Sequence, residues 1–282
     1  MVNTKRVLIT DLDNTLFDWF DVWYGAFNAM LNAVVELSGV PKDILVPEIK
    51  SIHQKYGTSE YSYLLEEIPS LLHKYGDRDK IYSSLDGAIH AYRSERKKRL
   101  KLYPTVLETL QELKSKQVKI IGYTESKEYY SNYRVSVLGL DGLIDELYSP
   151  ADHQIPVSAV KQTKYNLLHT INRHTPENET KPNPEILLDI IRQAGITPDA
   201  CVYIGDSEMK DIAMAQDAKV MDIFAKYGTG HFDNRIDAYQ LLRDVTHWTN
   251  EDVEREKKIK ESKRKVIPTY IAEQFSDVLK FF

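Results

Sequence analysis

The sequence lacks the features of several large protein classes. It has one cysteine, Cys201, in 282 residues, which excludes an intramolecular disulfide framework and is typical of a reducing cytosol. No stretch approaches the roughly 20 consecutive apolar residues of a membrane span, and the opening MVNTKRVLIT has no apolar signal-peptide region. We therefore expect a cytoplasmic protein without a membrane segment.

Strong charge of one sign and several common site motifs are missing too. The formal net charge is −5, and this mild acidity argues against nucleic acid as the main partner. There is no P-loop and no G-x-S-x-G motif, and GTG at 228–230 lacks the third glycine of a dinucleotide fingerprint. His169 and His174 have no zinc-ligand spacing. Cys201 lies inside an expected strand, which favours a core role over a nucleophile.

What the sequence does contain is an alternation of strand and helix patterns. Strands are expected at 5–10, 118–124, 144–149, 200–205 and 219–224, and helices at 105–116, 126–140, 182–195 and 209–218. The alternation predicts an α/β fold with a doubly wound parallel sheet covered on both faces. Residues 20 to 100 are helical in pattern throughout. The expected bounds are 1–16 and 103–282 for the α/β core, with 231–282 as its C-terminal helical extension, and 17–102 for an inserted helical domain.

Polar residues follow three of the expected strands. Asp11 and Asp13 follow the first, Thr124 follows the second and Asp206 follows the third. In parallel sheets, ligands bind beyond the carboxyl ends of the strands. Two carboxylates one residue apart repel each other unless a cation, a lysine or backbone N–H groups neutralise them. A divalent cation together with Lys181, which precedes a helix, would meet this requirement.

These motifs occur in the order found in the haloacid dehalogenase superfamily of phosphohydrolases, which the sequence resembles. They are DLDNT at 11–15, Thr124, Lys181 within TKPNPEIL, and GDSEMKD at 205–211. D-x-D-x-T alone is a weak signal, and the ordered set is a specific one. The resemblance covers 5–20 and 103–225, and it implies a Rossmann-like core, a helical cap inserted after the first motif, and hydrolysis of a small phosphorylated metabolite.

The resemblance also implies the catalytic roles. Asp11 would be the nucleophile that forms an aspartyl-phosphate, and Asp13 would be the general acid and then the base. Lys181 would neutralise the nucleophile and the transferring phosphoryl oxygens. For Asp13, a purely structural role in closing the strand is the alternative.

Phosphate contacts follow from the same resemblance. The Thr124 hydroxyl and the backbone N–H groups of Leu12 and Glu125 would bind the phosphoryl group. Thr15 and Asn14 are expected to shape the turn after the first strand, and Thr15 is expected to contact the site residues and not the substrate directly.

The implied metal is Mg²⁺, which prefers hard oxygen ligands. Its ligands would be the carboxylates of Asp11 and Asp206 and the main-chain carbonyl of Asp13. Asp211 would act indirectly, through the metal's waters or Lys181. Alternatively, Asp211 only favours the first turn of a helix.

Several segments fall outside the motifs. Trp23 is expected in a hydrophobic core, while Trp19 is left open between a core and a pocket role. The basic run at 93–101 is expected to be a solvated helix face. Residues 150–180 are expected to hold a helix and a polar loop that touch the site, substrate or a second subunit. The C-terminal residues are expected to form a charged surface helix and an apolar end, 271–282, that docks on the body.

Other functions remain open at this point. A phosphomutase would use the same aspartates and differ only in its product. A dehalogenase is disfavoured, because carbon–halogen displacement does not require the acid–base group Asp13. The alternative of a different class is a non-catalytic binding protein on the same scaffold. Nucleic-acid binding through 254–265 is less favoured, and a homo-oligomer is possible.

Overall fold

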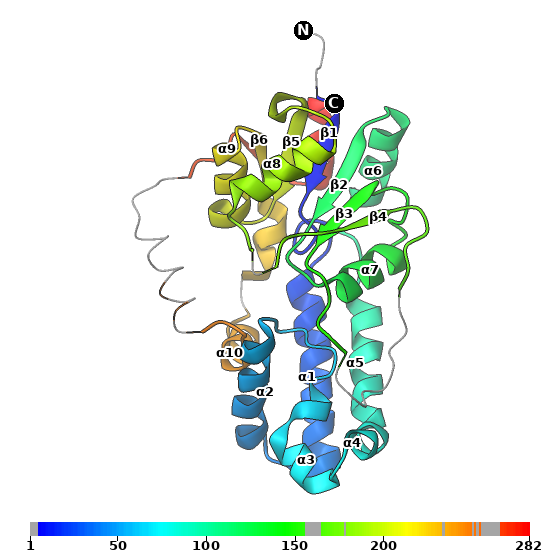
Figure 1. The fold of residues 1–282 in the computed structure, drawn as a ribbon, viewed down its shortest axis with the longest axis vertical. Coiled ribbons are helices and arrows are strands. Elements are labelled where there is room, and N and C mark those ends of the chain that lie inside the picture. Colours follow the sequence, from blue (N-terminus) through cyan, green and yellow to red (C-terminus); the bar gives the residue numbers. More distant parts are fainter. Residues whose placement is uncertain are drawn as a thin grey trace.

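The computed structural model describes residues 5–155, 165–177, 179–232, 235–249, 251, 254 and 266–282 (Figure 1). The strands are β1 (Val7–Thr10), β2 (Lys119–Tyr123), β3 (Glu146–Ser149), β4 (Ile171–His174), β5 (Cys201–Gly205), β6 (Met221–Ala225) and β7 (Tyr270–Ala272). Within these residues they form a seven-stranded sheet in the order β4-β3-β2-β1-β5-β6-β7. Every pair of neighbours is parallel, so the predicted doubly wound α/β fold is confirmed.

Alternate strand residues point to opposite faces of the sheet, and here they are apolar on both faces. Helices therefore cover each face. On one face, Leu8 and Ile120 pack with α6 (Val106–Ser115), α7 (Glu128–Val137) and the C-terminal 3-10 helix η5 (Phe275–Phe281). On the other, Ile9 and Tyr203 pack with α8 (Pro184–Gln193) and α9 (Ala213–Asp217). Cys201 is buried in this second cluster, as predicted.

Two edge strands were not predicted. β4 lies in the segment 150–180, which was expected to hold a helix; the part of it that the structure describes holds a strand paired with β3 instead. Residues 156–164 and 178 lie outside the described residues. β7 lies in the C-terminal segment and pairs with β6. β4 is largely exposed and mostly polar, and β7 is an apolar stretch of only three residues, so neither shows the longer apolar run that marks a buried strand.

The C-terminal end docks on the sheet, as predicted. Phe275 and Val278 are fully buried in the cluster that covers one face. The charged helix expected over 254–265 lies almost wholly outside the described residues.

Residues 17–102, the helical part, follow β1. They contain α1 (Trp19–Ser38), α2 (Lys42–Tyr56), η1 (Leu65–Glu67), α3 (Pro69–Tyr75), α4 (Arg78–Ser84) and α5 (Asp86–Arg99). Asp18 caps α1 by accepting a hydrogen bond from the backbone of Asp21, and Gly39 ends it in the left-handed region. The apolar faces form a cluster of their own, in which Trp23 is buried as predicted. Figure 1 shows α1 and α5 side by side, extending away from the sheet.

The chain returns to the helical part after β6. Helix α10 (Ile236–Val245) lies beside α2, and its Ala238, Leu241 and Val245 belong to the same cluster as Trp23 (Figure 1). The Nδ1 of His53 on α2 lies 2.6 Å from the Val245 carbonyl oxygen. The prediction of 231–282 as an extension of the α/β core did not include this contact, and the domain bounds stay a prediction.

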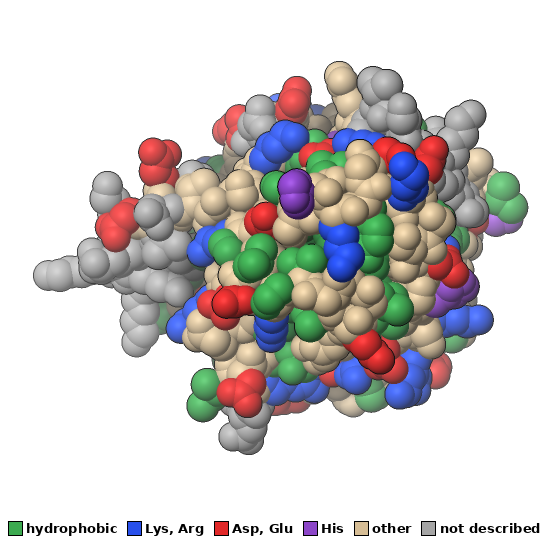
Figure 2. Space-filling model, turned by 90° about the horizontal axis from the view of Figure 1, so that it is seen from below, with side chains coloured by type: hydrophobic (Ala, Val, Ile, Leu, Met, Phe, Trp, Pro, Cys, Tyr) green, Lys and Arg blue, Asp and Glu red, His purple; other side chains and the backbone are tan. Residues whose placement is uncertain are grey.

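The surface mixes charges of both signs. Figure 2 shows the molecule from the end formed by the helical part, where Lys and Arg side chains alternate with Asp and Glu side chains over the described atoms. None of the described helices has the length and apolar character needed to cross a bilayer.

Candidate active site

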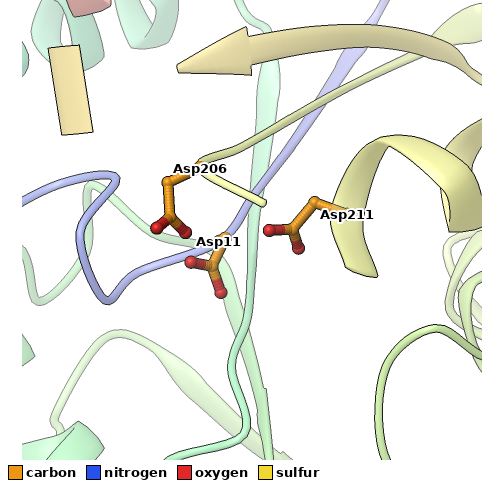
Figure 3. Close-up of side chains that lie close together, drawn as sticks. All are labelled: Asp11, Asp206 and Asp211. Carbon is orange, nitrogen blue, oxygen red and sulfur yellow. The ribbon is translucent and has the colours of Figure 1, made fainter. Parts of the chain in front are cut away.

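Three carboxylates meet at the carboxyl edge of the sheet (Figure 3). Asp11 follows β1, Asp206 follows β5, and Asp211 lies in the π-helical turn Glu208–Ile212 that comes next. Oxygen atoms of all three lie within 4.8 Å of one another. The structure thus brings together residues separated by almost 200 positions, because β1 and β5 are neighbours in the sheet.

Lys181 lies among these carboxylates. Its Nζ is 2.6 Å from Asp11 Oδ1 and 2.9 Å from Asp211 Oδ1, and the residue is only 4% exposed. The predicted pairing of a lysine with the first aspartate is therefore present in the geometry.

Burial and crowding dominate the electrostatics. Burial raises the pKa of Asp11 to about 7, against the opposing effect of Lys181. Burial, followed by the charges of Asp11 and Asp211, raises the pKa of Asp206 well above its ordinary value. Burial lowers the pKa of Lys181, but the two carboxylates beside it raise the pKa by more, so the lysine stays charged. One lysine thus faces three acidic groups, and the site favours a further cation.

Asp211 accepts three hydrogen bonds from protein donors. Its Oδ1 accepts hydrogen bonds from Lys181 and from the Tyr203 hydroxyl at 2.7 Å, and its Oδ2 accepts one from the Ser207 backbone at 3.1 Å. A Cβ at Gly205 would lie 2.4 Å from the Asp211 Cγ, so only glycine leaves room for this carboxylate. These contacts fix the Asp211 carboxylate beside Lys181, and Asp211 also belongs to the group of carboxylates that could hold a metal ion.

The carboxylates of Asp11 and Asp206 fit a divalent metal ion. No described side chain donates a hydrogen bond to Asp206, although its carboxylate is largely buried and lies beside that of Asp11. Hard, anionic oxygen donors with space for water are the donor set that Mg²⁺ prefers. Asp11 and Asp206 could hold such an ion.

Asp13 faces a different set of partners. Its Oδ2 accepts hydrogen bonds from Thr124 Oγ1 at 3.1 Å and Ser126 Oγ at 2.7 Å, and its Oδ1 accepts one from Arg134 Nη1 at 3.1 Å. Arg134 also binds Glu60. The sequence places Ser126 among the polar residues after the second strand but assigns it no role, and it does not predict Arg134 or Glu60. There was no signal for these two, because a buried arginine or glutamate looks like a surface one in a single sequence.

Two backbone N–H groups at the ends of β1 and β2 have no hydrogen-bond acceptor in the described part of the chain. Among the described residues, the N–H groups of Leu12 and Glu125 donate to no protein acceptor. The Glu125 side chain accepts a hydrogen bond from the Lys181 backbone at 3.0 Å and one from Lys210 Nζ at 2.8 Å. Glu125 therefore connects the loop after β2 to the loop that carries Lys181, a second role that the sequence did not reveal.

The turn after β1 is held from two sides. Thr15 Oγ1 donates to Asp11 Oδ2 at 3.3 Å, and the Tyr227 hydroxyl donates to the Thr15 carbonyl at 2.7 Å. Asn14 adopts a φ of 57° and accepts a hydrogen bond from the Phe20 backbone. A Cβ at Gly228 would lie 1.9 Å from the Asn14 carbonyl oxygen. The GTG stretch therefore supplies a close backbone approach to the catalytic turn.

This arrangement of strand-end residues agrees with the family comparison. The model of the haloacid dehalogenase-like hydrolases matches residues 5–219. The chain belongs to this family. The match begins just before β1 and ends beyond Asp211, so it includes all of the motif residues.

Individual relatives of this hydrolase are distant. A glyceraldehyde 3-phosphate phosphatase of Methanopyrus kandleri is 22% identical over 230 residues, which cover 79% of this chain and 84% of the relative. A 2-haloacid dehalogenase structure from Pseudomonas syringae superimposes with a TM-score of 0.55 at 18% identity, covering 98% of this chain and 97% of the other. A predicted phosphoglycolate phosphatase from Haemophilus somnus gives 0.51 at 17% identity and covers 99% of both chains. The two structures show the shared fold.

Proposed function

We propose that this hydrolase is a Mg²⁺-dependent phosphatase that cleaves a small phosphorylated metabolite through an aspartyl-phosphate on Asp11. The observation that carries the proposal is the contact of Asp11 with the buried Lys181 at 2.6 Å, beside the carboxylate of Asp206. The curated relative from Methanopyrus is named as a phosphatase, which supports a phosphoric monoester as the substrate class.

In the first step, an Asp11 carboxylate oxygen attacks phosphorus. The oxygen–phosphorus bond to Asp11 forms as the bond to the leaving oxygen breaks, and Asp13 gives its proton to that oxygen. Lys181 and the N–H groups of Leu12 and Glu125 stabilise the charge on the phosphoryl oxygens. Thr124 joins them by turning its hydroxyl from Asp13 to the phosphate.

In the second step, water attacks the aspartyl-phosphate. Asp13, now ionised, takes a proton from the water, and the phosphorus bond to Asp11 breaks to release inorganic phosphate and regenerate the carboxylate. A bound Mg²⁺ would neutralise the negative charge that Asp11, Asp206 and the substrate share. Asp13 is the residue that separates this reaction from dehalogenation, because a halide leaves without a proton.

Two variants test the mechanism. Asp11→Asn should keep the fold and lose phosphate release by several orders of magnitude, because an amide oxygen is a poor nucleophile. Asp13→Ala should still form the phosphoenzyme from p-nitrophenyl phosphate, whose leaving group needs no proton, and should then accumulate it. Rapid quench with labelled substrate would show a burst of protein-bound phosphate followed by slow release.

The opposite results are equally clear. Substantial turnover by Asp11→Asn with an unchanged melting curve would mean that water attacks phosphorus directly. Equal loss on aryl and alkyl phosphates in Asp13→Ala, without trapped phosphoenzyme, would remove the acid–base role of Asp13. Transfer of the phosphoryl group back to a sugar, in place of free phosphate, would identify a mutase.

A further inference from the structure

We propose that Arg134 and Glu60 are positioning residues for Asp13, and that the helical part completes the acid–base group of the sheet through them. Arg134 orients the Asp13 carboxylate, and Glu60 orients Arg134. The inference rests on the proposed function, since it assigns what supports the proton-transfer residue of that reaction.

Arg134 and its neighbour hold both oxygens of Asp13. Nη1 of Arg134 lies 3.1 Å from Asp13 Oδ1 and 2.8 Å from the hydroxyl oxygen of Ser126. That hydroxyl donates to Asp13 Oδ2 at 2.7 Å. Because donors face both oxygens, with Thr124 as a second donor to Oδ2, and because Arg134 also contacts Ser126, the plane of the carboxylate is set. The Arg134 side chain is only 3% exposed, so water contributes little to its solvation.

Glu60 provides the other half of the arginine's environment. Nη2 of Arg134 lies 2.7 Å from both carboxylate oxygens of Glu60. Glu60 Oε2 also accepts a hydrogen bond from the Trp19 indole at 3.0 Å, and the Glu60 backbone donates to Thr58. The Glu60 side chain is 9% exposed. The sequence left the role of Trp19 open between core and pocket. In the structure its indole holds Glu60, which in turn contacts Arg134.

The contact between Arg134 and Glu60 joins the two parts of the molecule. Arg134 lies on α7, which packs on the sheet, whereas Glu60 lies between α2 and η1 in the helical part. The donors to Asp13 all belong to the sheet part, whereas Glu60, which holds Arg134 from its other side, comes from the helical part. A buried guanidinium that loses one of two carboxylate partners must move toward the other or toward water. Either movement displaces Asp13, and a displacement of about 1 Å in a reacting group can cost on the order of 100-fold in rate.

The test compares Glu60→Gln and Arg134→Met with wild type on two substrates. Glycerol 3-phosphate has an alkoxide leaving group that needs a proton, and p-nitrophenyl phosphate does not. We expect kcat/KM for the alkyl ester to fall at least tenfold more than kcat/KM for the aryl ester in both variants. Trp19→Phe removes one hydrogen bond to Glu60. It should lower the ratio of kcat/KM for the alkyl ester to kcat/KM for the aryl ester by a smaller factor.

A matched control distinguishes positioning from stability. Glu66 is another buried glutamate of the helical part. It pairs with Arg78 at 3.2 Å and, among the described residues, forms no hydrogen bond with Asp13 or Arg134. Glu66→Gln should lower the melting temperature as Glu60→Gln does and leave the ratio of the two substrates unchanged. If Glu60 acts through Arg134, the double variant Glu60→Gln/Arg134→Met should have the same ratio as Arg134→Met alone.

Several outcomes would overturn the inference. An unchanged ratio in a folded Glu60→Gln, equal losses on both esters, or additive losses in the double variant would each leave Arg134 and Glu60 with a structural role only. If Arg134→Met does not fold, Glu60→Gln and Trp19→Phe still decide. A wild-type protein that releases phosphate from neither ester would refute the proposed function itself, which is a separate result.

Discussion

Asp11 and Asp13 are separated by one residue, and each carboxylate is paired with its own cationic side chain. Lys181 forms an ion pair with Asp11, and Arg134 forms an ion pair with Asp13. The repulsion that two adjacent carboxylates would suffer is therefore offset at both positions before any metal binds. The sequence motifs pointed to the lysine. They could not point to the arginine, which reaches Asp13 from α7 and lies 121 positions further along the chain.

Metal removal is the direct test at the residue scale. If Asp11 and Asp206 hold Mg²⁺, chelator should abolish phosphate release and Mg²⁺ should restore it, while Ca²⁺ should restore it poorly because its coordination is larger and looser. Mg²⁺ should also raise the melting temperature, since an ion that binds only the native state stabilises it. Calorimetry of wild type and Asp206→Asn, with and without Mg²⁺, measures this.

The variant separates binding from catalysis. Asp206→Asn should lose most of the Mg²⁺-dependent rise in melting temperature. Its metal-free form should be at least as stable as wild type, because one buried negative charge is gone. Full turnover in chelator, or an equal Mg²⁺ response in the variant, would contradict the assignment of Asp206 as a ligand.

At the scale of elements, His53 joins α2 to the end of α10. Its ring is completely buried, and Nδ1 must carry the proton that it donates to the Val245 carbonyl. Burial lowers the pKa of His53 to about 4, the Val245 carbonyl raises it, and the nearby His247 lowers it further. The histidine is therefore neutral in the folded protein over the physiological range.

This neutrality makes the helical part sensitive to acid. An unfolded histidine titrates near pH 6.5, so between pH 6.5 and about 4 the unfolded chain binds a proton that the folded chain excludes. The free energy of unfolding should carry the full His53 contribution above pH 6.5 and lose it as the pH falls to 4, by roughly 3 kcal/mol in total. Urea unfolding across this range measures the loss.

His53→Asn is the comparison variant. The asparagine amide can still donate to Val245 but does not titrate, so its unfolding free energy should decline less steeply between pH 6.5 and 4. Fluorescence of the buried Trp23 reports on the helical part directly. An identical pH dependence in both proteins would show that other groups cause the acid sensitivity.

At the scale of the whole molecule, the chain beyond the family match is part of the fold. The match ends at residue 219, before β6, α10, β7 and η5. Gln274 and Asp277 form a capping box at the start of η5. The Ser276 backbone donates to Thr105 Oγ1 at 3.1 Å, which ties the C-terminal end to the start of α6. The C-terminal segment thus closes one face of the sheet.

Truncation of one aromatic ring in this segment should have a large effect. Phe275 is fully buried in the main cluster, so Phe275→Ala should lower the free energy of unfolding by about 3–5 kcal/mol, the usual cost of a buried aromatic. Phe282→Ala, at a partly buried ring of the same segment, should cost clearly less. Equal, small effects in urea unfolding would show that the segment does not contribute to the core.

The sequence by itself determined the elements that bury apolar side chains on both faces. β1, β2, β3, β5 and β6 were all predicted. Four of them, β1, β2, β5 and β6, are largely apolar runs, as is typical of strands inside a parallel sheet, whereas β3 is only partly apolar. The motif residues were found for a related reason: each follows such a strand or precedes a helix, and parallel strands end at one edge.

Only the tertiary structure decided the edges and the contacts between parts. β4 is mostly polar and β7 is an apolar stretch of only three residues, so neither sequence predicts a strand. The amphipathic pattern of α10 does not indicate which element it packs against. The contact of Glu60 with Arg134 joins residues 74 positions apart. The periodicity of apolar residues indicates which face of an element is buried and how much of it, since burial favours apolar residues at those positions. It does not indicate which other element that face packs against, because this depends on how distant segments of the chain pack.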